Sequence, residues 1–198
     1  MGKAGQRSLN RSALAEAVEQ LTRALDLMVT LRPTPALRRE QINIQVALIT
    51  PLIHTKGYSA PETKTAAEQA RLLIEQAEAL GEAPEDPLLL FSVLYSFWVA
   101  NYVAFKGDAL LELATQFMAL AEKQGTVVPL LIGHRLLGAT FVGTGDFAAS
   151  RSHLDRAIAL YDPVEHRPLA TRFGLDSRVS ILCFDRGPCG RLAILMLH

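Results

Sequence analysis

Short glycine-containing turns recur along the chain, each between two segments that favour helix, and this recurrence limits the fold more than any other feature. The turns lie at residues 55–58, 105–108 and 144–147. Each follows an apolar segment and precedes a segment rich in Ala and Leu. Because glycine allows the positive φ that ends a helix, we expect each turn to join the two helices of a hairpin. Recurring hairpins of this size predict a solenoid, in which each hairpin packs against its neighbours in the chain.

Between the turns, apolar residues recur every three or four positions, which is the period of an amphipathic helix. No segment alternates apolar and polar residues as a half-buried strand would, so the sequence predicts an all-α fold. The first helix should begin at Asn10 or Ser12, either of which can cap it. The expected helices span residues 10–28, 37–54, 59–80, 87–105, 110–123, 129–142, 147–161 and 168–184.

Proline and glycine mark several of the expected helix ends. Pro33 and Pro35 should end the first helix, and Pro51 should kink or shorten the second. Gly81 should stop the third helix. The last helix should be interrupted near Gly174.

The clearest copy of the repeat is residues 131–163. Its small and large residues follow a set order around the turn: Gly138, Phe141, Gly145, Ser150, Leu154, Ala157 and Pro163. This order resembles the tetratricopeptide repeat, in which small residues let the two helices approach and large ones fill the gap. A copy at residues 101–120 matches less well, because Glu112 stands where the repeat favours Ala. We expect a tetratricopeptide-like solenoid of α-helical hairpins over residues 1–184, followed by an irregular tail at 185–198.

Composition argues against several functional classes. The 20 Lys and Arg residues balance 20 Asp and Glu residues, so the chain lacks the basic surplus typical of nucleic-acid binding. Cys183 and Cys189 are the only cysteines and cannot staple a fold of this size. Their scarcity favours a reducing, cytoplasmic compartment. The N-terminus has no apolar stretch of the kind that forms a secretory signal.

Residues 87–105 raise the question of a membrane span. They carry no charge and approach the length that crosses a bilayer. Ser92, Ser96 and Asn101 interrupt the apolar run, however, and amphipathic segments flank it on both sides. We therefore expect a helix buried in a helical stack and no contact with a membrane.

The sequence offers no arrangement of catalytic or metal-binding residues. Residues 138–145 are rich in glycine but lack the lysine and the preceding strand of a phosphate-binding loop. The two cysteines do not have zinc-site spacing, and His134 and His153 lie on different helices. We expect no catalytic residue, no cofactor, no metal site and no enzymatic activity.

Asn101 is the candidate peptide-binding residue. Aligned with the repeat, it occupies the first-helix position that faces the concave groove, where such arrays bind extended peptides. One Asn side chain can both donate to and accept from a peptide backbone. The matching position in the next copy is Ala139, so a full carboxylate clamp is not expected. The alternative is a buried polar residue that is satisfied inside the helical stack.

A family resemblance rests on residues 35–40 (PALRRE), 55–62 (TKGYSAPE), 138–140 (GAT) and 153–167 (HLDRAIALYDPVEHR). These strings resemble the C-terminal tetratricopeptide-like region of large bacterial proteins that join a class III adenylate/guanylate cyclase domain to an AAA-type ATPase domain. The resemblance covers about residues 5–184. The cyclase's metal-binding aspartates and the ATPase's phosphate-binding loop have no counterpart here, so no catalytic residue carries over.

The resemblance implies a non-catalytic scaffold for protein–protein or interdomain contacts in signalling. Its partner would be another protein, a peptide, or the ATPase and cyclase domains of a parent protein. The alternative is a cyclase or ATP-binding regulator whose catalytic domains are absent from this chain.

Both ends of the chain depart from a complete repeat. Residues 5–8 resemble the middle of a repeat, just before its second helix. Residues 185–191 bring glycine and proline where the next repeat should begin, and residues 184–198 can be back-translated so that another reading frame gives a good repeat start. We therefore expect a truncated fragment of a frameshifted or degraded gene, whose uncovered apolar faces would favour self-association.

Overall fold

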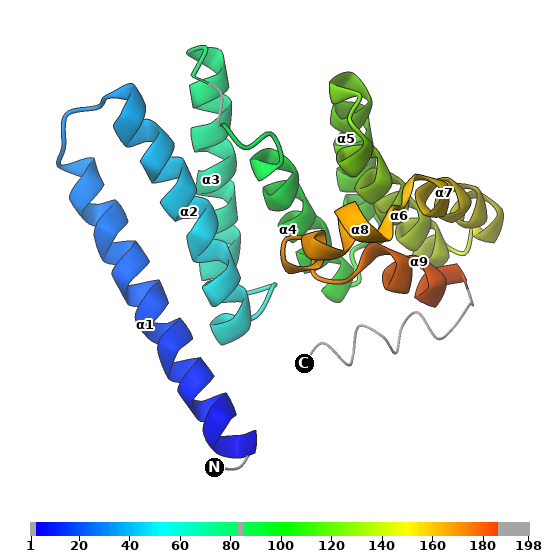
Figure 1. Cartoon of the computed structure of the whole chain (residues 1–198), viewed down its shortest axis with the longest axis horizontal. Helices are drawn as coiled ribbons and strands as arrows, with labels where there is room; N and C mark the ends of the chain where they lie inside the picture. Colours follow the sequence, from blue (N-terminus) through cyan, green and yellow to red (C-terminus); the bar gives the residue numbers. More distant parts are fainter. Residues whose placement is uncertain (1–2, 83–84, 186–198) are drawn as a thin grey trace. The chain divides into compact units, whose positions relative to one another are not determined.

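The computed structural model describes residues 3–82 and 85–185 of the chain (Figure 1). Throughout these residues the regular structure is helical and no strand is present, which confirms the all-α prediction. The chain divides into two compact units, Met1–Val103 and Ala104–His198. The predicted irregular tail at 185–198 lies outside the described residues except for its first residue, which ends a helix.

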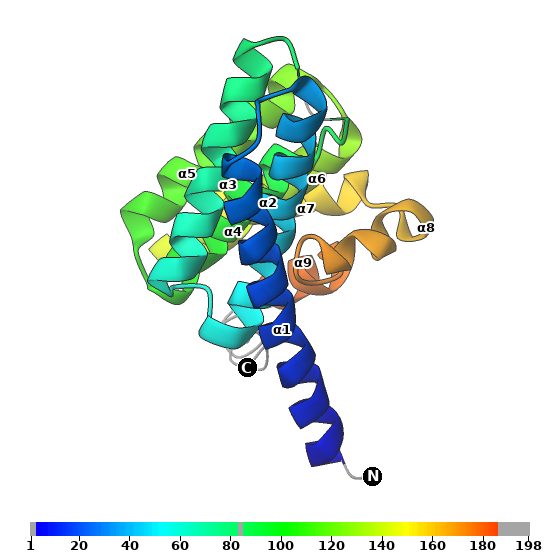
Figure 2. The ribbon, with the colours of Figure 1, turned by 90° about the vertical axis from the view of Figure 1, so that its left-hand side faces the viewer.

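In the first unit, each helix packs against the next one in the chain. The helices are α1 (Lys3–Val29), α2 (Pro35–Lys56), α3 (Pro61–Ala79) and α4 (Leu89–Val103). The N-terminal part of α1 extends beyond α2 and α3 (Figure 2). This sequential packing of neighbouring helices is what the recurring turns predict for this part of the chain.

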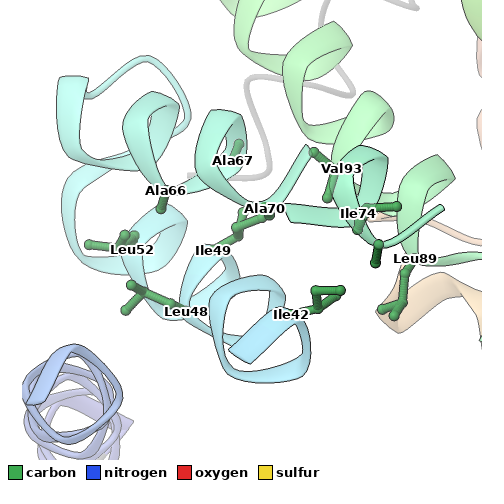
Figure 3. Packing of buried hydrophobic residues seen from close by; sticks show 11 residues of the cluster. Ile42, Leu48, Ile49, Leu52, Ala66, Ala67, Ala70, Ile74, Leu89 and Val93 are labelled. Atoms are coloured by element: carbon green, nitrogen blue, oxygen red, sulfur yellow. The ribbon is translucent and has the colours of Figure 1, made fainter. Parts of the chain in front are cut away.

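The core of the first unit forms where α2, α3 and the start of α4 meet (Figure 3). Large aliphatic side chains of α2 face α3, which contributes mainly alanines. Small side chains on one helix allow the axes to approach, so the large ones of the partner fill the space between them. The labelled members of this core are Ile42, Leu48, Ile49, Leu52, Ala66, Ala67, Ala70, Ile74, Leu89 and Val93.

In the second unit, α6 (Val127–Thr144) is the central helix. It packs against α5 (Gly107–Gln124), α7 (Phe147–Leu160) and α9 (Ser177–Asp185), and α9 also packs against α7. Between α7 and α9 lie the single turn α8 (Pro163–His166) and the 3₁₀ helix η1 (Arg167–Thr171). The α6–α7 hairpin therefore forms the framework on which α9 rests.

One helix among the described residues, α6, is long and apolar enough to cross a membrane by length and composition alone. Most of it is buried inside the second unit, as expected for the core helix of a helical protein. The segment that raised the membrane question in the sequence forms α4, which has only 15 residues. At about 1.5 Å per residue, a helix of this length falls short of the hydrocarbon thickness of a bilayer.

The turns at 55–58 and 144–147 are confirmed as helix ends. Gly57 has φ 96° and follows α2, and Gly145 has φ 85° and follows α6. The expectation for the turn at 105–108 is wrong in detail. Gly107 begins α5, and the positive φ falls on Phe105, at 55°.

Three other helix boundaries differ from the prediction. Helix α1 begins at Lys3, ahead of the caps expected at Asn10 or Ser12. Pro35 starts α2, because Thr34 caps it by accepting from the backbone N–H of Leu37 and proline suits the first helical position. Pro51 does not shorten α2, which continues to Lys56. The carbonyl of Ala47, which loses its usual donor at Pro51, lies in an exposed residue where water can replace it.

The prediction for the last helix, at residues 168–184, is wrong over its first half. Helix α7 ends at Leu160, before Pro163 as expected, but Pro163 then begins a helical turn that was not predicted, because the Asp162 side chain accepts from the backbone N–H groups of Val164 and Glu165. Helix α9 starts only at Ser177, after the predicted interruption near Gly174, whose φ is 77°. The predicted interruption near Gly174 is therefore confirmed, but the part of the helix before it is the 3₁₀ helix η1 and a loop.

Replacing Phe105 with glycine should raise the free energy of unfolding by roughly 0.5–1 kcal/mol. Phe105 is 82% exposed and adopts a left-handed conformation that costs a residue with a Cβ but suits glycine. Urea denaturation of Phe105→Gly gives the change. Phe147→Gly is the matched control, because this Phe is also exposed but lies at the start of α7, where glycine should lower stability. Equal losses in both variants would contradict the positive φ at position 105.

Candidate functional site

Asn101 lies in the last turn of α4 and is half-buried. Its Nδ2 donates to the backbone carbonyl of Phe97, 2.9 Å away on the same helix. No other hydrogen bond to this side chain is formed by the described residues, so the second amide hydrogen and the carbonyl oxygen remain for a partner. The side chain is thus held by its own helix and still presents a donor and an acceptor.

Aromatic side chains surround Asn101 on α4. Trp98, one turn earlier, places its ring 4.9 Å from that of Tyr102, and the two rings are tilted by 33°. Trp98 is buried and Tyr102 is half-buried. We call Trp98, Asn101 and Tyr102 the α4 surface. An amide beside aromatic rings is a combination that protein-binding surfaces favour.

The turn between α2 and α3 anchors the end of α4. Ser59 Oγ donates to the backbone carbonyl of Ala100, 3.2 Å away. The neighbouring Tyr58 is largely removed from water, and this burial, with a smaller contribution from Tyr95, raises the pKa of its hydroxyl to about 12. The turn therefore holds the C-terminal end of α4, and with it Asn101, in a defined position.

In the second unit, α6 and α7 approach closely at Gly138. A Cβ at this position would lie 2.5 Å from Cδ2 of Leu154 and 3.3 Å from the backbone oxygen of Ser150. Ser150 Oγ donates to the Gly138 carbonyl over 2.9 Å. Ser150, Leu154 and Ala157 are all buried. The small and large residues singled out in the sequence therefore meet at the contact between these two helices.

The same hairpin brings together His134 and His153, which the sequence only placed on different helices. Their Nδ1 atoms are 2.9 Å apart, and the ring of His153 also stacks on Phe141 with centroids 5.6 Å apart. One Nδ1 must donate and the other accept, so the two neutral rings hold opposite tautomers. The predicted hairpin places α6 beside α7, but the sequence does not specify which of their side chains meet.

The surroundings keep both rings neutral. Burial, then the neighbouring His153 and Arg156, lowers the pKa of His134 to about 4. Burial and Arg156 also lower the pKa of His153. We call His134 and His153 the histidine pair.

Arg135 is buried in the second unit, with 2% of its surface exposed. Its guanidinium donates to the backbone carbonyls of Phe173 and Leu175, at 3.1 and 3.3 Å, and approaches the hydroxyl of Ser177. The sequence analysis missed this residue, because a single Arg in an apolar helix gives no signal of its partner. Its role is to fix the segment that leads into α9.

No group of three or more His, Cys, Asp or Glu side chains is close enough to hold a metal ion in the part of the chain that the structure describes. The candidate site residues offer hydrogen-bonding groups and aromatic rings, which are carried on helices.

No family model, curated protein or solved structure matches the chain.

Proposed function

We propose that the chain is a non-catalytic helical-repeat scaffold that binds another protein or peptide. The observation that carries this proposal is the packing of α9 against both α6 and α7. A helix that rests on both members of the preceding hairpin is the arrangement by which solenoids extend from one repeat to the next. Solenoids of this kind work by offering surface to a partner.

The tetratricopeptide-like character of residues 131–163 is part of this proposal. Its support is the contact at Gly138, where small residues let α6 and α7 approach and Leu154 fills the space. The resemblance to helical regions of cyclase–ATPase proteins favours the ATPase module of a parent protein as one partner. A cytoplasmic location, where such modules act, remains an expectation.

The α4 surface is the proposed docking site for an extended peptide. A peptide backbone needs both a donor and an acceptor, and the Asn101 amide has one of each in addition to its bond to Phe97. The half-buried Tyr102 supplies apolar area next to these polar groups, and the buried Trp98 packs against its ring. The peptide would lie along α4 with its backbone on the amide.

Replacing Asn101 with alanine should weaken peptide binding about tenfold, the equivalent of about 1.4 kcal/mol for a lost pair of hydrogen bonds. The probe is a linear peptide recovered from a random display library with the full chain as bait, and its Kd is measured by calorimetry. Asn43→Ala is the matched control, since Asn43 is exposed on α2, away from the α4 surface.

Equal affinities for the wild type and both variants would remove Asn101 from the site. Failure to recover any peptide would contradict the peptide-binding proposal itself. Saturable binding of ATP to the purified chain would favour the nucleotide-regulator alternative over the scaffold.

A further inference from the structure

The histidine pair joins α6 to α7 through one direct side-chain hydrogen bond. A hydrogen bond between two Nδ1 atoms at 2.9 Å requires that at least one of them carries no proton. When both rings are neutral, one donates and the other accepts. When one ring is protonated, it can still donate to its neutral partner. When both are protonated, two N–H groups and two positive charges face each other, and the bond is lost.

Among the side chains that the structure describes, no carboxylate compensates for charge on the pair. On α7, Arg156 acts on both rings, while Arg151 and Asp155 are exposed and lie 3.9 Å from each other. On α6, the guanidinium of Arg135 turns to the carbonyls before α9. Helices α5 and α9 also carry charged residues, and none of those with a described side chain affects the pKa of either ring: Asp108, Glu112, Glu122, Lys123 and Arg178. The side chain of Asp185, the last residue of α9, is not among those described. The charged side chain that does act on both rings is Arg156, and its positive charge opposes their protonation.

The pair also lies at a structurally sensitive place. His134 is 8% exposed, and the Gly138 contact follows one turn later on α6. Helix α9 rests on both α6 and α7, so any separation of the hairpin removes part of the support of α9. A metal ion is a weaker interpretation, because a third ligand is absent from the described residues and Arg156 repels a cation.

We propose that the histidine pair is a pH-sensitive switch: the α6–α7 hairpin is held closed while at least one ring is neutral and loosens, releasing α9, when both rings take up a proton. The histidine pair belongs to the second unit, whereas the α4 surface belongs to the first.

The sign of the pH dependence follows from the lowered pKa values. The unfolded chain binds a proton at each histidine as the pH falls through about 6.5, whereas His134 in the folded chain resists protonation until about pH 4. The contribution of the pair to stability is therefore complete above about pH 6.5 and is lost as the pH falls towards 4. This lowering of the His134 pKa on folding corresponds to an unfolding constant about 100-fold higher at the acidic end of the range than at the neutral end.

The test compares urea denaturation at about pH 7.5 and about pH 3.5, below the pKa of about 4 for His134, for the full chain and its variants. Over this range the unfolding constant of the wild type should rise about 100-fold more than that of the double variant His134→Gln, His153→Gln. His54→Gln is the control, because His54 is exposed on α2 and should leave the wild-type pH dependence unchanged. An equal pH dependence in the wild type and the double variant would overturn the switch.

Nitrogen-15 NMR of the histidine rings in the wild-type chain provides a test that needs no variant. The switch predicts opposite tautomers for His134 and His153 at neutral pH and a titration of His134 well below the ordinary histidine pKa of about 6.5. As His134 titrates, amide signals of α9 should lose protection from solvent exchange. If both paired rings titrate near the ordinary histidine pKa of about 6.5, or α9 stays protected after they titrate, the proposal is wrong.

Discussion

Gly138→Ala should lower the free energy of unfolding of the second unit by about 2 kcal/mol, the cost of adding volume where none is available. Alanine is normally the better helix former, so helix propensity alone predicts the opposite sign. The new Cβ would lie 2.5 Å from Cδ2 and 2.6 Å from Cγ of Leu154, and the Ser150 backbone oxygen lies on the same side. Since part of this obstacle is backbone, a rotamer change of Leu154 cannot remove it completely.

Gly143→Ala is the matched control on the same helix. Gly143 is exposed in the last turn of α6, and a Cβ there meets nothing within 4 Å. This variant should be stabilised by about 0.5–1 kcal/mol, because glycine loses more backbone entropy on folding than alanine. Urea denaturation of the two variants should therefore give changes of opposite sign. Stabilisation by both substitutions would mean that α6 and α7 are not in close contact.

Arg135→Met should cost about 3 kcal/mol and release α9 from the rest of the second unit. Methionine retains the length of the side chain but cannot donate to the Phe173 and Leu175 carbonyls, which Arg135 satisfies. The loss should be visible both in urea denaturation and in faster amide exchange over α9. Arg135→Lys should fall between the wild type and Arg135→Met, because one ammonium group cannot reproduce the forked geometry of a guanidinium.

Arg151→Met is the control for this prediction. The Arg151 side chain is 73% exposed, and its contact with Asp155 at 3.9 Å is a surface ion pair. Such pairs contribute little, so the change should stay within about 0.5 kcal/mol. If Arg135→Met lowers the free energy of unfolding no more than Arg151→Met does, the Arg135 guanidinium does not stabilise the segment that leads into α9.

The sequence predicted the elements whose signals are local. The apolar period located most of the helices, and Gly57 and Gly145 end theirs as expected. Local rules failed where the neighbours of a residue decide its conformation. Pro51 is tolerated because the carbonyl that it leaves without a donor belongs to an exposed residue, and Phe105 takes the left-handed conformation that the rule assigned to Gly107.

The candidate sites also differ in whether the sequence could reveal them. Asn101 was chosen from its register in the repeat, and its place on α4 beside Trp98 and Tyr102 is compatible with the binding role, which stays a prediction. The histidine pair and Arg135 depend on contacts between residues 19 to 42 positions apart in the chain. No pattern along the sequence specifies such contacts, because they exist only once α6, α7 and α9 have packed.

The central claim is that α9 stacks on both helices of the preceding hairpin, as a repeat array requires. The most direct measurement is a set of methyl NOEs from Ile181, which lies on α9 and is only 2% exposed. We predict NOEs from its methyl groups to side chains on both α6 and α7. NOEs to neither helix, or to one of them alone, would contradict the stacked arrangement and, with it, the scaffold function.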